Sequence, residues 1–237
     1  MDIITINNVC KTYKTKKALD NVSLSIKQGE LFGLLGVNGA GKTTLIKILC
    51  GLTKKTSGTV IISDLDLDKD IDKIKEIIDI SPQETSVANN LTVKENLEFF
   101  ANIYNSNGEI EDVVSLFNLN EVLNQRAKTL SGGYKRRLSI AIALISKPKI
   151  LFLDEPTLGL DVFARRELWK IIKTLQKKIT IILTSHYLEE IENLCDRVAV
   201  LSNGKLLQTG TIEEIKKMTN TNNFEDAFIK LVEAKNE

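Results

Sequence analysis

The 237-residue sequence has no apolar run that approaches the roughly 20 residues of a membrane-spanning helix. Its longest candidates, residues 138–145 and 150–153, are much shorter. The net charge is only +1, so the overall charge gives no indication of binding to nucleic acid. If this protein works at a membrane, we expect another chain to provide the span.

Cysteine is also scarce, and its distribution argues against disulfides and metal sites. The three cysteines, Cys10, Cys50 and Cys195, lie far apart, and their number is odd. Residues 1–8 contain an acid and polar residues where a secretory leader would have an apolar core. We therefore expect reduced thiols that behave as small hydrophobic side chains in a cytosolic protein.

What the sequence does contain is an alternation of apolar runs and helical patterns. The apolar runs at residues 31–35, 150–154 and 179–184 predict strands of a parallel sheet that is buried on both faces. Asn203 and Gly204 separate two further strand patterns and predict a hairpin turn. The remaining predicted strands cover residues 3–6, 24–26, 58–62, 198–201 and 205–208.

Helical patterns are concentrated in the middle of the chain. Thr92 and Glu95 have the spacing of a capping box, which predicts a helix that continues to residue 104. A turn is expected at residues 105–108. The sequence therefore predicts an α/β core with a helical insertion at about residues 89–147. Further helices are predicted over residues 43–49, 109–117, 133–146 and 224–232.

Residues 36–43 carry the most specific motif in the sequence. They fit the pattern G-x-x-x-x-G-K-[ST] and lie between a predicted strand and a predicted helix. Glycines let successive backbone N–H groups point at phosphate oxygens, and the start of the helix adds to this attraction. Lys42 would bridge the β- and γ-phosphates, and Thr43 would place its hydroxyl on Mg²⁺. The predicted nucleotide-binding residues are Gly36, Val37, Asn38, Gly39, Ala40, Gly41, Lys42, Thr43 and Thr44.

Two adjacent acids, Asp154 and Glu155, follow an apolar strand at the edge of the sheet where α/β proteins place their sites. Asp154 would hold Mg²⁺ through water, and Glu155 would polarise an attacking water as a general base. Together with the phosphate loop, these acids indicate a nucleotide-hydrolysing protein of the P-loop class. A guanine-reading Asn-Lys-x-Asp motif is absent from the sequence, which argues against a GTPase.

The third motif is Leu130-Ser131-Gly132-Gly133, which is followed by Lys135-Arg136-Arg137. Ser131 can cap the helix that follows and leave its N–H groups free for an anion. Placed shortly before the strand that ends at Asp154, this motif resembles the signature of ABC ATPases. Tyr134 departs from that signature, which usually has Gln at this position.

The resemblance to ABC ATPases extends over essentially the whole chain and implies roles for further residues. Tyr13 matches the aromatic residue that stacks on adenine, and Gln83 matches the Q-loop residue that touches Mg²⁺ and the attacking water. Asp161, which the resemblance implies as an ATP-binding residue, ends a match to the D-loop, in which Leu158 stands where Ser is common. His186, the single histidine, matches the switch histidine that contacts the γ-phosphate. The implied catalytic residues are thus Glu155, His186, Gln83 and Lys42.

The resemblance also implies a fold, with a RecA-like core, an N-terminal antiparallel β subdomain and an inserted α-helical subdomain. It divides a single domain, residues 1–237, into four stretches. The core with its β subdomain would comprise residues 1–88 and 148–210, the helical subdomain residues 89–147, and a C-terminal helical tail residues 211–237.

The same resemblance implies ATP and Mg²⁺ as cofactors, and two kinds of protein partner. Two ATPase subunits meet head to tail in this family, so Ser131, Gly132 and Gly133 would contact ATP held by the other subunit. A separate membrane permease would hold the protein at the inner, cytoplasmic face of the membrane. No nucleic-acid partner is expected.

The type of ABC ATPase is predicted from smaller matches. The 91–97 stretch, the signature with Tyr134, and the tail at residues 224–228 look like the ATPase subunits of bacterial drug and antibiotic exporters. The sequence lacks the long coiled-coil insertions of the DNA-repair class and has one cassette where the translation class normally has two. A single-cassette ATPase for iron–sulfur cluster assembly remains an alternative.

Overall fold

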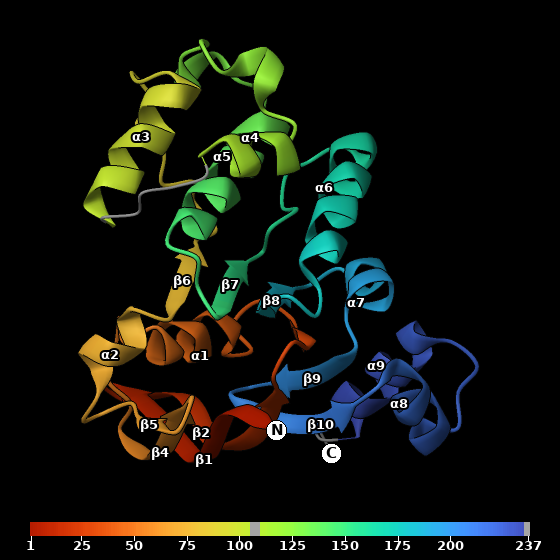
Figure 1. Cartoon of the computed structure of the whole chain (residues 1–237). Coiled ribbons are helices and arrows are strands. Elements are labelled where there is room, and N and C mark those ends of the chain that lie inside the picture. The colour runs from red at the N-terminus through yellow and green to blue at the C-terminus, as the bar shows by residue number, and fades with distance from the viewer. Residues whose placement is uncertain (105–109, 235–237) are drawn as a thin grey trace.

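Two sheets organise residues 1–104 and 110–234, which are the residues that this computed structural model describes (Figure 1). The predicted turn at residues 105–108 lies outside the described residues. The smaller sheet has the strand order β2-β1-β4-β5, and all its pairs are antiparallel. Its strands are β1 (Asp2–Tyr13), β2 (Lys16–Lys27), β4 (Ser57–Ile62) and β5 (Leu65–Asp66).

The first two strands are much longer than predicted, with 12 residues each. The predictions at residues 3–6 and 24–26 found only the parts of β1 and β2 in which apolar residues are regularly spaced. Register shifts between Ile6 and Val9, and between Val9 and Lys11, interrupt that spacing without ending the pairing. Period-2 patterns in the sequence therefore end before the strands do.

The larger sheet has the order β10-β9-β3-β8-β7-β6. All neighbours are parallel except β10 and β9, which form the hairpin predicted at Asn203 and Gly204. Both turn residues have the positive φ angles of such a turn, 49° and 76°. The strands are β3 (Leu31–Leu35), β6 (Ile78–Ser81), β7 (Ile150–Asp154), β8 (Thr180–Ser185), β9 (Arg197–Ser202) and β10 (Lys205–Gly210).

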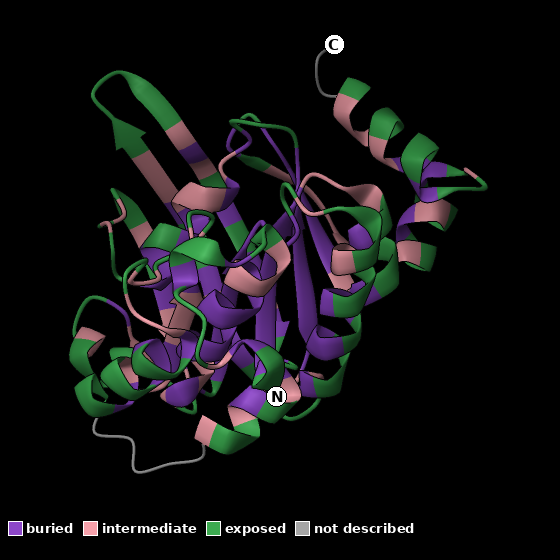
Figure 2. Cartoon of the chain, turned by 90° about the horizontal axis from the view of Figure 1, so that it is seen from above, coloured by how far each residue is buried: buried purple, intermediate pink, exposed green. Residues whose placement is uncertain are grey.

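The larger sheet is buried on both faces, as its apolar strands predict. On β3, Leu31 and Leu35 belong to one hydrophobic cluster, while Phe32 and Leu34 belong to another on the opposite face. The first cluster packs against the helical region, and the second packs against α1 (Lys42–Leu49) and the smaller sheet. Figure 2 shows the central strands buried and the outward faces of the helices exposed.

The helices that lie between β6 and β7 in the sequence form the predicted insertion, and Figure 1 shows them grouped together beyond these two strands. Thr92 and Glu95 make the predicted capping box, because each side chain accepts a backbone N–H of the other.

Among the helices of the described residues, none combines the length and the apolar character that a membrane span requires. The helices that complete the fold are α2 (Ile71–Lys75), α3 (Val93–Ile103), α4 (Ile110–Leu116), α5 (Gly132–Ile145), α6 (Val162–Leu175), α7 (Leu188–Leu194), α8 (Ile212–Thr219) and α9 (Phe224–Glu233).

Parallel strands end at one edge of the larger sheet, and this edge positions the candidate site. Leu35 at the end of β3 pairs with Ser185 at the end of β8, and Asp154 at the end of β7 pairs with Thr184. The loops that follow these strands therefore begin side by side, although they are far apart in the sequence.

Candidate functional site

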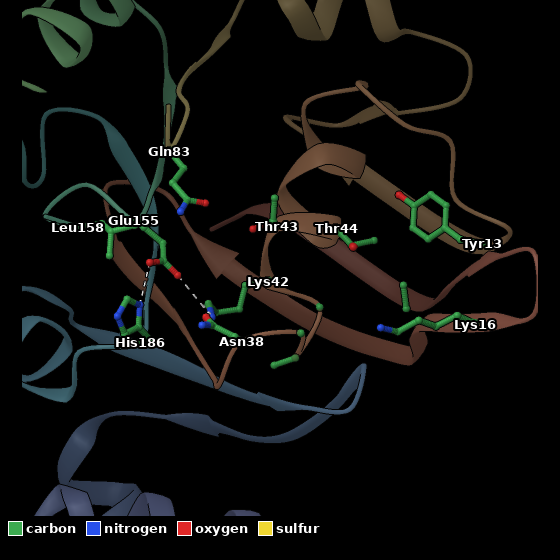
Figure 3. A pocket seen from close by; sticks show the side chains of 14 residues that line it. Tyr13, Lys16, Asn38, Lys42, Thr43, Thr44, Gln83, Glu155, Leu158 and His186 are labelled. Carbon is green, nitrogen blue, oxygen red and sulfur yellow. Dashed lines mark ion pairs between the residues drawn. The ribbon is translucent and has the colours of Figure 1, made fainter. Parts of the chain in front are cut away.

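A cavity of about 590 Å³ opens at this edge of the sheet (Figure 3). It brings together most of the residues predicted for a nucleotide site, from elements as distant as β1 and the segment after β8. Its lining residues are Tyr13, Lys16, Ala18, Asn38, Gly39, Ala40, Gly41, Lys42, Thr43, Thr44, Gln83, Glu155, Leu158 and His186.

The loop after β3 has the conformation of a phosphate-binding loop. Gly39 and Gly41 have φ angles of 83° and 107°, which only glycine adopts without strain. A Cβ atom on Gly36 would lie 2.4 Å from the carbonyl oxygen of Leu201, so this position also requires glycine. Gly41 is the residue before α1, so the free N–H groups at the start of that helix face the loop.

The side chain of Lys42 is folded back into the loop and is only 5% exposed. Its Nζ atom donates to the carbonyl oxygen of Gly36 at 2.6 Å and lies 3.7 Å from Oε1 of Glu155. Burial lowers the pKa of Lys42, and the carboxylates of Glu155 and Asp154 partly oppose this effect. A buried cation is thus held where a phosphate chain would pass.

Glu155 lies between two cationic or ionisable partners (Figure 3). Its Oε1 faces Lys42, and its Oε2 lies 2.8 Å from Nδ1 of His186. The second contact is close, but its angles are not those of an aligned hydrogen bond. The backbone of Glu155 has φ 49°, a left-handed conformation that costs a non-glycine residue about 1–3 kcal/mol. This strained backbone directs the carboxylate into the cavity.

Asp154 lies behind Glu155 and is fixed by two hydroxyl groups. Thr184 donates to its Oδ1 at 2.6 Å, and Thr43 donates to the same oxygen at 3.4 Å. Thr184 also accepts the backbone N–H of Glu155 at 2.9 Å. The Thr43 hydroxyl lies 3.4 Å from the Asp154 carboxylate, and Gln83 lines the same cavity as Thr43, so these side chains offer hydroxyl, carboxylate and amide oxygens of the kind that Mg²⁺ prefers.

The remaining predicted residues do not line this cavity. Ser131 caps α5 through an N–H from Tyr134 at 3.4 Å, as predicted, and Ser131 and Gly132 are exposed. Asp161 is also exposed, and its carboxylate caps α6 by accepting two backbone N–H groups at 2.9 Å. The signature residues and Asp161 therefore do not contribute to the cavity of their own chain.

Sequence reasoning missed residues that only the fold brings to the site. Lys16 and Ala18 line the cavity but belong to no motif. Thr184 was predicted only as the end of a strand, yet it holds both Asp154 and Glu155. Arg136 was noted only as part of the signature, although its guanidinium is buried against the segments that carry the site.

The family of the chain follows from comparison with known proteins. The model of the ABC transporter family matches residues 19–158. The chain belongs to the ABC transporter family. The chain is 39% identical over 215 residues to the linearmycin resistance ATP-binding protein LnrL of Bacillus subtilis strain 168, covering 88% of this chain and 69% of LnrL. The predicted family is therefore confirmed.

A second relative of this ABC transporter family member is also described as an ATP-binding protein of a transporter. The chain is 36% identical over 241 residues to the probable multidrug ABC transporter ATP-binding protein YbhF of Escherichia coli strain K12, covering 97% of this chain. It spans only 42% of the length of YbhF.

The fold is confirmed by a solved structure, the dimeric ATP-binding cassette MJ0796 in a post-hydrolysis state bound to ADP and Pi. The two chains superpose with a TM-score of 0.78 at 28% identity, covering 88% of this chain and 98% of that one. The predicted class, an α/β ABC ATPase cassette, is thus correct.

Proposed function

We propose that this chain binds ATP together with Mg²⁺ and hydrolyses it to power transport through a separate membrane permease. The observation that carries the proposal is the position of the Glu155 carboxylate. It enters the cavity at the phosphate loop, beside the Lys42 amine and the His186 imidazole. A carboxylate in this position can orient an attacking water and accept its proton, which the phosphate loop itself cannot do.

Binding of the nucleotide is assigned to the loop and to one aromatic residue. The N–H groups of residues 36–43 would surround the phosphates, and Lys42 would exchange its carbonyl contacts for phosphate oxygens. Tyr13 lies far from the phosphate loop in the sequence but lines the same cavity. Its ring would stack on the adenine ring. Its ring is supported by Lys11, whose Nζ lies 4.6 Å from the ring centre.

Hydrolysis is assigned to Glu155, which would orient a water toward the γ-phosphate and accept its proton. His186 would contact the γ-phosphate and hold the carboxylate of Glu155 in place. When bound, Mg²⁺ supplies neutralising charge to the phosphate oxygens, and Thr43, Gln83 and Asp154 would hold it. Thr184 fixes Asp154 and Glu155 before the nucleotide arrives.

A complete site would need a second ATPase subunit. Ser131, Gly132 and Gly133 do not line the cavity of their own chain, so they would be available to close the site of a head-to-tail partner. The similar cassette MJ0796 is dimeric in its post-hydrolysis structure, which supports this arrangement. Loss of the γ-phosphate would then loosen the dimer.

Export of a drug or antibiotic is the transport function that we favour. LnrL is described as a linearmycin resistance protein and YbhF as a probable multidrug transporter component. We place the chain at the cytoplasmic face of the membrane through its permease, with Gln83 and the helical insertion transmitting the motion.

The enzymatic part is tested by phosphate release from ATP by the purified chain with Mg²⁺. We expect turnover that disappears in Lys42→Ala. The control is Lys47→Ala, an exposed residue of the same helix, which should hydrolyse like the wild type. Hydrolysis unaffected by Lys42→Ala would contradict the assigned site.

The transport part needs the membrane partner. A tagged copy should co-purify with a hydrophobic permease chain, and ATP hydrolysis by that complex should rise when the transported compound is added. Recovery of the chain with iron–sulfur assembly proteins, and without a permease, would instead favour the alternative role.

A further inference from the structure

Arg136 is a buried cation on the second turn of α5, with only 4% of its surface exposed. Within the described residues it forms no ion pair, unlike its neighbour Arg137, which pairs with Glu167. Burial lowers the pKa of Arg136 to about 10, so the guanidinium remains charged at neutral pH. A buried charge without a carboxylate partner must be satisfied by hydrogen bonds.

Backbone carbonyls of the segment that bears the general base provide most of these bonds. The Nη2 atom donates to the carbonyl oxygens of Asp154 at 2.7 Å and Glu155 at 2.6 Å, and Nε donates to that of Pro156 at 2.7 Å. These bonds bracket the residue with φ 49°, so the guanidinium holds Glu155 in its left-handed conformation.

The other side of the guanidinium holds the segment after β6. Its Nη1 atom donates to the carbonyl oxygen of Pro82 at 2.5 Å and to that of Gln83 at 3.3 Å. Gln83 and Glu155 both line the cavity, and one side chain therefore fixes the backbone of both. Arg can do this because its planar fork presents five donors in fixed directions, which Lys lacks.

The helix that carries Arg136 begins with the signature. Arg136 is the fourth residue after Gly132, so the two positions are about one helical turn, roughly 6 Å, apart on one rigid element. Movement of the helix start toward a nucleotide held by a partner subunit would move the guanidinium with it. The carbonyls of residues 82–83 and 154–156 would follow, since they are hydrogen-bonded to it.

We propose that Arg136 is a positioning residue that links the two sites of the dimer: it couples the signature's contact with the partner's nucleotide to the placement of Glu155 and Gln83 in its own chain. The proposal rests on the head-to-tail dimer of the proposed function. It assigns Arg136 to the site of its own subunit, although the signature on the same helix serves the opposite site.

The first test compares Arg136→Gln with Arg137→Gln, which also removes a buried guanidinium from α5 but leaves the segments of the site untouched. We expect Arg136→Gln to lower kcat about 10- to 100-fold, which is the usual scale for residues that orient a functional side chain without touching the substrate. ATP binding by the monomer should stay within about twofold of the wild type. Arg137→Gln should keep its kcat per folded molecule, whatever its effect on Tm.

The second test uses mixed dimers with two affinity tags, in which only one subunit keeps Glu155. When Arg136→Gln lies in the subunit with the intact Glu155 and Glu155→Gln lies in the other, hydrolysis should fall 10- to 100-fold. When both substitutions lie in one subunit, the wild-type partner should hydrolyse ATP as fast as in a dimer that carries Glu155→Gln alone.

The two arrangements separate positioning from damage to the helix. Equal losses in both, or no loss in the first, would overturn the proposal. If Arg136→Gln does not fold, Arg136→Lys replaces it, since it keeps the charge and loses the fork, and the same comparison applies. Failure of the proposed function is distinguishable, because a wild-type dimer would then show no hydrolysis in either experiment.

Discussion

Nδ1 of His186 lies 2.8 Å from Oε2 of Glu155, although the two residues follow different strands. The contact is a direct consequence of sheet order. Glu155 follows β7 and His186 follows β8, and these strands are parallel neighbours that end at the same edge. Because neighbouring parallel strands end at the same edge of a sheet, the residues that follow them can lie side by side although they are distant in the sequence.

Replacement of Glu155 by Gln tests the role of this carboxylate. The amide keeps the shape of the side chain but cannot accept a proton, so we expect hydrolysis to fall about 10²–10⁴-fold. ATP binding should persist, and the ATP-bound dimer should accumulate because its γ-phosphate is not removed. Single-turnover phosphate release and size-exclusion chromatography with ATP measure both effects. Turnover near that of the wild type would sink the assignment.

Replacement of Ser131 by Arg tests whether the signature acts on the partner's nucleotide. Ser131 is exposed and lies outside the cavity of its own chain, so the larger side chain should block the dimer interface and leave that cavity open. We expect loss of hydrolysis with unchanged ATP binding to the monomer, measured by calorimetry.

The matched control is Ser131→Ala, which removes the cap of α5 without adding bulk. It should cost about 1 kcal/mol of stability and retain more of the activity than the arginine variant. If Ser131→Arg abolishes monomer binding as well, the contact is made within one chain.

The phosphate loop and Glu155 were predicted from short local patterns, and His186 was predicted from the resemblance to ABC ATPases and from its place after a buried strand. The structure places these residues together in one cavity with Tyr13 and Gln83. Their roles in ATP binding and hydrolysis remain predictions that the proposed experiments test.

Residues that act through tertiary contacts could not be predicted in this way. Thr184 reads as an ordinary strand residue, and its bonds to Asp154 and Glu155 exist only because β7 and β8 are neighbours. Arg136 appears in the sequence only as one of the basic residues after the signature, and its burial depends on the packing of α5 over the sheet edge. The predicted lengths of β1 and β2 were likewise too short, because register shifts interrupt the alternation of apolar residues on which the prediction depended.

The exposed ring of Tyr13 provides a prediction about nucleotide affinity. It is 44% exposed, so removing it should cost little stability. Stacking on a base contributes about 1–3 kcal/mol by alanine substitution, so Tyr13→Ala should weaken ATP binding by about 5- to 150-fold. Tyr13→Phe keeps the ring and should bind almost as well as the wild type. Equal affinity of the alanine and phenylalanine variants would place adenine elsewhere.

Glu190 provides a prediction about stability and pH. Its side chain is fully buried on α7, and Oε1 accepts the indole N–H of Trp169 at 3.1 Å. Burial raises the pKa of Glu190, and nearby donors, Trp169 among them, only partly oppose this effect. The folded protein therefore binds this proton more tightly than the unfolded chain does. As pH rises from the ordinary glutamate value of about 4.3 to the raised pKa, the free energy of unfolding should fall, and above that pKa the contribution of Glu190 should level off.

Glu190→Gln removes the charge and keeps an oxygen that can accept the Trp169 N–H. We expect this variant to be more stable than the wild type above the raised pKa, and to lose the part of the pH dependence that Glu190 contributes. Urea unfolding at a series of pH values from about 4 to 8 measures both. Glu189→Gln, on the exposed side of the same helix, is the control and should keep the wild-type slope. If Glu190→Gln also keeps that slope, the buried carboxylate does not set the pH dependence, and another group must be titrating.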